Sequence, residues 1–172
     1  MSTRLTTAIK IADSANAVLQ RVNSFDFETA RSCKGWDLKA HIGIDPMLLA
    51  LAMELALKAW YVFDHDTTKV IRSHNLAKLF VGLKPESQNK LDTAFRRSVA
   101  LNHPILFDTE YGILDVLEHH AEAFVDWRYL YENQKTLSFN QSEFVATLEM
   151  VLQEFRKRYR VERIEPPWDR LK

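Results

Sequence analysis

Apolar residues along the chain recur at intervals of three and four instead of alternating with polar ones, which predicts helices and no convincing strand. Near the N-terminus this spacing covers about residues 5–22, where we expect an amphipathic, peripheral helix. Its apolar face is formed by Ala8, Ile11, Ala15, Val18 and Val22.

A second helix is expected to begin at Pro46, because proline fits the first helical position, where its missing N–H costs nothing. Asp45 precedes it and can accept hydrogen bonds from the free amides of the first turn. Small alanines alternate with larger side chains on its inner face, so a neighbouring helix can come close, which suits the centre of a bundle. That face consists of Leu48, Ala52, Leu55, Ala59 and Val62.

Two shorter helices are predicted in the middle of the chain. Ser73 can cap the first, and Pro85 opens the second, which continues to about Ala100 and ends before His103. The first carries Leu76, Leu79, Phe80 and Leu83, and the second carries Leu91, Ala94, Phe95 and Val99.

Two longer helices complete the prediction. One covers about residues 108–132, and the other begins after Asn140, where Glu143 stands at the capping-box position. The first has Ile113, Leu117, His120, Phe124, Trp127 and Tyr131 on one face. The stripe of the second is Val145, Leu148, Leu152, Phe155 and Tyr159.

Composition agrees with a single helical core. The chain has 172 residues, 47% of them hydrophobic and 27% charged, and only four glycines and five prolines interrupt it. We therefore predict an all-α fold, an up-and-down helical bundle of five or six helices.

Charge and cysteine content bear on partners and compartment. The 23 basic and 23 acidic side chains cancel, so a general electrostatic attraction to nucleic acid or anionic membrane is not indicated. Cys33 is the single cysteine, which favours a reducing compartment. The most apolar run, residues 46–63, carries Glu54 and Lys58 at helical spacing and is interpreted as a buried core helix instead of a membrane span. We predict a soluble, cytoplasmic protein.

No motif for a cofactor or metal is present. The glycines are too far apart for a phosphate-binding loop, and one cysteine excludes a thiolate zinc cluster. The segment EHHAE, residues 118–122, could offer histidine and carboxylate, but the Glu-x-x-His pairs of a di-metal bundle are missing. We expect a solvated charged face there, with no metal and no cofactor.

The segment WRYLYENQK, residues 127–135, places an arginine among large aromatic side chains. Arg128 can pack its alkyl stem at the edge of the core with its head on Glu132, or it can hold a phosphate through its guanidinium. On the second interpretation Tyr129, Tyr131 and His120 join it as candidate ligand-binding residues.

Three other polar features have ordinary structural explanations. His120 lies in an apolar stripe, where a histidine is more often a core residue than a catalyst. His74 follows the predicted cap and can simply finish the turn that enters its helix. The basic run at residues 156–163 is interpreted as a solvated C-terminal turn favoured by the helix dipole, with phosphate binding as the alternative.

Three short motifs follow one another along the chain: ELALKA from Glu54 to Ala59, HNLAKL from His74 to Leu79, and Arg128-Tyr129 before the final helix. In order and spacing they resemble the HEPN family, small helical domains linked to nucleotide and RNA processing. The resemblance covers roughly residues 45–159. It implies three parts: residues 1–44 as an N-terminal helix and connection, residues 45–162 as a HEPN-like bundle, and residues 163–172 as a tail.

The resemblance also implies a function and partners. HEPN domains commonly form homodimers with a cleft between the protomers, and they often work beside a nucleotidyltransferase in toxin–antitoxin or defence systems. In the ribonuclease members an arginine is followed after four to six residues by a histidine. The histidine takes the proton of a ribose 2′-hydroxyl while the arginine stabilises charge on the phosphate, without a metal.

This chain departs from that pattern, because Asn133, Gln134 and Lys135 stand where the histidine after Arg128 would be. The spacing recurs between Arg97 and His103, at the end of a different helix, which makes these two weak catalytic candidates. We therefore expect a HEPN-like nucleotide- or RNA-associated binding module. The alternatives are a metal-independent endoribonuclease, using Arg97 and His103 or Arg128 with a histidine from elsewhere, and a purely structural bundle.

Overall fold

The computed structural model describes residues 3–32, 43–102, 111–132 and 136–164; for residues 3, 25–32 and 159–164 it describes the backbone alone. The described residues form helices and no strand, so the predicted all-α bundle is confirmed. In chain order the helices are α1 (Thr3–Ser32), α3 (Ile44–His65), α4 (Leu76–Val81), α5 (Pro85–Ser98), α6 (Ile113–His119), α7 (Ala123–Arg128) and α8 (Gln141–Ile164).

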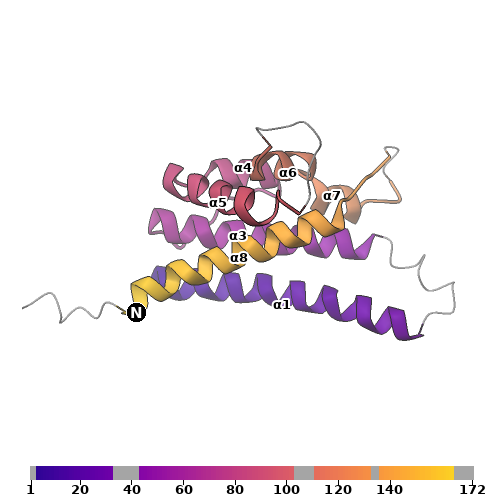
Figure 1. Ribbon diagram of the computed structural model, residues 1–172, viewed down its shortest axis with the longest axis horizontal. Helices are drawn as coiled ribbons and strands as arrows, with labels where there is room; N and C mark the ends of the chain where they lie inside the picture. Colours follow the sequence, from indigo (N-terminus) through magenta and orange to yellow (C-terminus); the bar gives the residue numbers. More distant parts are fainter. Residues whose placement is uncertain (1–2, 33–42, 103–110, 133–135, 165–172) are drawn as a thin grey trace, which may run out of the picture.

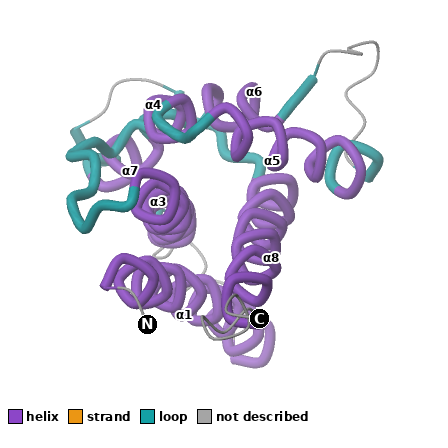
Figure 2. Tube along the Cα trace, turned by 90° about the vertical axis from the view of Figure 1, so that its left-hand side faces the viewer, coloured by secondary structure: helices purple, strands orange, loops and turns teal. Residues whose placement is uncertain are grey.

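The three long helices, α1, α3 and α8, run along the long axis of the molecule, with α1 antiparallel to α3 (Figure 1). The short helices α4, α5, α6 and α7 lie on the side of α3 and α8 that faces away from α1 (Figure 2). The α1 helix is longer than predicted, and its buried residues belong to the same hydrophobic core as α3. These are Leu5, Ala8, Ala12, Ala15, Leu19 and Val22.

The α3 helix is the central helix, as its small and large residues predicted. It is buried on nearly all sides because α1, α4, α7 and α8 all pack against it. Its largest fully buried side chains are Leu49, Met53, Leu57 and Trp60. By length and composition α3 could cross a membrane, but 67% of its most apolar stretch is buried inside the protein, as in a core helix.

The predicted helix starts are correct in part. Asn140 caps α8 as expected, since its Oδ1 accepts from the Glu143 amide at 3.4 Å and its Nδ2 donates to the Glu143 carboxylate at 2.9 Å. The cap of α4 is Asn75 and not Ser73, because the Asn75 Oδ1 accepts from the Lys78 amide at 2.8 Å. The α3 helix begins before Pro46, at Ile44, with Gly43 at the cap position.

The single helix predicted over residues 108–132 is wrong. The α6 helix ends at His119, and a turn at residues 120–122 separates it from α7; residues 108–110 lie outside the described part of the chain. The break has a tertiary cause. The Ala121 carbonyl accepts from the Leu76 amide at 3.0 Å, and the Asn75 side-chain amide donates to the Glu122 carboxylate at 2.7 Å. The start of α4 thus uses groups that a continuous helix would use itself.

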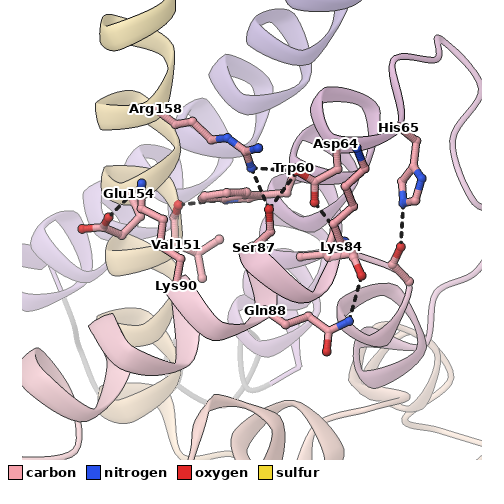
Figure 3. Close-up of polar contacts among 12 residues, drawn as sticks. Trp60, Asp64, His65, Lys84, Ser87, Gln88, Lys90, Val151, Glu154 and Arg158 are labelled. Atoms are coloured by element: carbon pink, nitrogen blue, oxygen red, sulfur yellow. Dashed lines mark hydrogen bonds and ion pairs between the residues drawn. The ribbon is translucent and has the colours of Figure 1, made fainter.

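The interpretation of the basic run as a solvated turn is wrong for Arg158. Its guanidinium donates to Asp64 Oδ1 at 2.7 Å and to Ser87 Oγ at 2.6 Å (Figure 3). The Asp64 side chain is fully buried, and it also accepts from the Ser87 hydroxyl and from the Lys84 amide. The guanidinium lies 4.5 Å from the centre of the Phe63 ring. Arg158 therefore fastens α8 to α3 and α5.

Candidate functional site

A buried carboxylate on α3 is the centre of the most distinctive polar cluster. The Glu54 side chain is only 4% exposed, and its two oxygens are bound separately. Oε1 accepts from Lys58 Nζ at 2.5 Å, one turn along α3, and Oε2 contacts His74 Nδ1 at 2.9 Å. Because one carboxylate oxygen is occupied by the lysine, the other is free to fix the orientation of the histidine.

His74 stands at the edge of this cluster with about half of its side chain, 54%, exposed. Its ring stacks on Phe124 of α7, with centroids 5.0 Å apart and planes 26° apart. Since Nδ1 is held by Glu54, the second ring nitrogen, Nε2, lies on the other side of the ring. A histidine held in this way by a carboxylate is suited to hydrogen bonding and proton transfer.

The segment that carries His74 is itself fixed to the turn between α6 and α7. Asn75 caps α4 and binds Glu122, and the next amide, of Leu76, binds Ala121. His74 therefore has a defined position relative to α7. Its predicted role, to finish the turn entering α4, is compatible with this geometry and does not account for the contact with Glu54.

Arg128 lies on the same face of α7 as Phe124, because residues four apart in a helix are neighbours. Its side chain is exposed, and among the described residues its guanidinium contacts no carboxylate; it lies 5.4 Å from the centre of the Tyr129 ring. Tyr129 is 44% exposed and Tyr131 96% exposed. The expected arrangement with the Arg128 head on Glu132 is therefore not the one observed.

His120 is placed apart from these exposed side chains. It is buried at the end of α6, 3% exposed, and its ring contacts Phe139 and Phe144 at centroid distances of 4.6 and 5.1 Å. Burial, together with the neighbouring His119, lowers the pKa of His120 to about 4. This environment agrees with the core interpretation of His120.

Arg97 lies exposed near the end of α5, in a groove of about 570 Å³ between α5 and α8. Lys90 and Lys157 share this groove, and both pair with Glu154, at 3.7 and 2.5 Å. The other member of the weak catalytic pair, His103, lies outside the described residues.

No protein-family model, curated protein or solved structure matches this chain. The HEPN resemblance and everything that depends on it therefore stay predictions. Sequence reasoning did not find the pairing of Glu54 with His74, because 20 residues separate them and nothing local joins them. Their positions in the first two of the three motifs were the available signal.

Proposed function

We propose that this protein is a HEPN-like binding module that holds a phosphate group of a nucleotide or RNA at Arg128. The supporting observation is the exposed Arg128 guanidinium, which has no carboxylate partner among the described residues. A guanidinium in this state keeps its fork of N–H donors for a phosphate. The exposed rings of Tyr129 and Tyr131 provide surfaces on which bases can stack.

His74 supports the same assignment. Glu54 orients its ring, and Phe124 connects it to the α7 face that carries Arg128. A phosphate bound at Arg128 would then lie near a second group able to donate a hydrogen bond. Nucleotides and RNA combine a phosphate with a flat base, so the exposed tyrosines favour them over inorganic phosphate.

The remaining parts of the proposal come from the resemblance. The module would be a soluble, cytoplasmic homodimer, working beside a nucleotidyltransferase-type partner in a toxin–antitoxin or defence system. The burial of α3 inside the protein supports solubility.

Binding of a labelled structured RNA, followed by fluorescence anisotropy, tests the phosphate site. Hydrogen bonds to charged groups contribute about 1.5–3 kcal/mol, so Arg128→Ala should weaken binding about ten- to hundredfold. It should also reduce the salt dependence by about 0.7 per lost phosphate contact if the bound segment is single-stranded. Arg97→Ala is the matched control, because Arg97 is an exposed arginine on another helix. Equal affinity for wild type and Arg128→Ala would remove the basis of the proposal.

One observation favours a second function, a metal-independent endoribonuclease. His74, held by Glu54, is a histidine supplied from elsewhere in the fold to the neighbourhood of Arg128. It would take the proton of a ribose 2′-hydroxyl, whose oxygen then attacks the phosphorus. The bond to the 5′-oxygen breaks and that oxygen takes a proton from solvent, while Arg128 stabilises the charged phosphate.

Incubation of the purified protein with labelled RNA in the presence of a chelator separates the two functions. An endoribonuclease would release 2′,3′-cyclic phosphate ends, and His74→Ala would abolish cleavage. His74 is half exposed, so this substitution should leave the fold intact. If wild type binds RNA without cleaving it, the endoribonuclease is excluded and the binding module is retained.

A further inference from the structure

A separate small pocket lies where α6 gives way to α7. It has a volume of about 200 Å³ and is bounded by the end of α6, by α7 and by residues 136–138. Figure 1 shows these two helices side by side at the end of the bundle that also carries α4. Its volume is below the range of about 300–1,000 Å³ typical of drug-sized ligands, so it suits a smaller molecule.

The pocket contains a buried polar side chain without a protein partner. His120 lines it and is 3% exposed, and among the described residues its ring nitrogens make no hydrogen bond. Within the described residues no side-chain nitrogen or oxygen that is sealed from solvent lacks a partner. The unpaired nitrogens of His120 are therefore reached from the pocket. A buried polar group of this kind calls for a hydrogen-bonding ligand or an ordered water.

The charge of the pocket selects a cation. The carboxylates of Glu122 and Asp126 line it together with His120, and the lowered pKa of His120 keeps its imidazole neutral at pH 7. A neutral imidazole has one nitrogen that accepts a hydrogen bond. Glu122 Oε1 is bound by Asn75, which leaves the second oxygen of that carboxylate for a ligand. An anion would meet two negative charges here.

The cation is organic and not a metal ion. Among the described residues no group of three His, Cys, Asp or Glu side chains is placed to hold a metal. Trp127 and Leu137 also line the pocket and offer apolar surface beside the acceptors. An alkylammonium combines three N–H donors with an apolar chain, and its charge is favoured beside an aromatic ring.

We propose that this pocket binds a primary alkylammonium group, which donates hydrogen bonds to Glu122 and to the His120 imidazole while its chain lies along Trp127. The group can belong to a free amine or to a lysine side chain of another protein. This site uses none of the residues assigned to the phosphate site, so either can fail without the other.

The experiment follows the histidine ring resonances of the full chain by NMR during titration with n-butylammonium. We expect the His120 signals to shift saturably, and Glu122→Gln to weaken the binding about tenfold. Glutamine keeps an oxygen that can accept from Asn75, so the α4 contact should survive. Glu118→Gln, an exposed carboxylate on α6 that does not line the pocket, is the matched control and should bind like wild type.

Four further ligands identify the recognised group. 1,4-Diaminobutane represents a free amine and Nα-acetyl-lysine amide represents a lysine side chain, and saturable binding by either one supports the site and names its source. Tetramethylammonium lacks N–H donors and 1-pentanol lacks charge, so neither should shift the His120 signals. Equal shifts by 1-pentanol or tetramethylammonium, no shift with n-butylammonium, or unchanged affinity in Glu122→Gln would each overturn the proposal.

Discussion

Replacing Arg158 by methionine tests the contact that fastens α8 to α3. The substitution removes the charge partner of Asp64, whose side chain is fully buried. Breaking a buried ion pair from one side costs about 3–5 kcal/mol, because the other charge stays buried without compensation. Arg158 is itself 30% exposed, and Asp64 keeps its bonds from Ser87 and the Lys84 amide, so we take the lower limit. We expect the free energy of unfolding to fall by about 3 kcal/mol.

Urea unfolding followed by far-ultraviolet circular dichroism measures this loss, with the slope of the transition expected to stay unchanged. For a chain of this length the melting temperature should fall by roughly 6–12 °C, at about 2–4 °C per kcal/mol. Lys157→Met is the matched control. Lys157 is 59% exposed and pairs with Glu154 on the same helix, so its loss should stay below about 1 kcal/mol.

A double substitution separates the ion pair from packing. If the buried charge causes the loss, Asp64→Leu together with Arg158→Met should recover part of the stability lost in Arg158→Met alone. The reasoning is refuted if Arg158→Met loses no more stability than Lys157→Met. It is also refuted if the two substitutions at the buried pair simply add, since the charges would then be uncoupled.

Three further predictions concern the end of the bundle that carries α6. The pKa of His120 is lowered from 6.5 to about 4, so the unfolded chain takes up this proton first as the pH falls. The contribution of His120 to stability, about 3 kcal/mol, should therefore be lost between about pH 6.5 and pH 4, and urea titrations of wild type and His120→Phe at pH 7 and pH 5 should show the slope only in wild type. Tyr111→Phe removes a 2.8 Å hydrogen bond to the buried Glu143 carboxylate and should cost about 1–3 kcal/mol by urea unfolding; an unchanged midpoint would contradict it. A methyl group on Gly112 would lie 2.4 Å from Asp92 Oδ1, which accepts from the backbone at the start of α6, so Gly112→Ala should lower the melting temperature by a few degrees, in contrast to an alanine at an exposed α5 position.

Much of the helical framework could be predicted from the chain because its causes are local. Apolar residues three and four apart bring a face together within one helix, whatever lies elsewhere in the fold. The central position of α3 followed from its alanines, and the start of α8 followed from Asn140 and Glu143. The motifs also pointed to His74 and Arg128 as noteworthy residues, although not to any contact between the segments that carry them.

The errors arise where distant segments compete for local groups. Nothing near Ala121 ends a helix, and the break between α6 and α7 exists because the Leu76 amide takes its carbonyl. The basic run looked solvated because the partner of Arg158, Asp64, lies 94 residues earlier. The same limit applies to the candidate site.

By itself, the sequence determined an all-α fold, a central apolar helix and an arginine among aromatic side chains before the last helix. Only the tertiary structure decided that Glu54 orients His74, that His74 stacks against the α7 face carrying Arg128, and that His120 faces a separate acidic pocket. Helix periodicity repeats every few residues and can be detected along the chain. Hydrogen bonds and ion pairs between helices depend on how those helices pack, which no local pattern encodes.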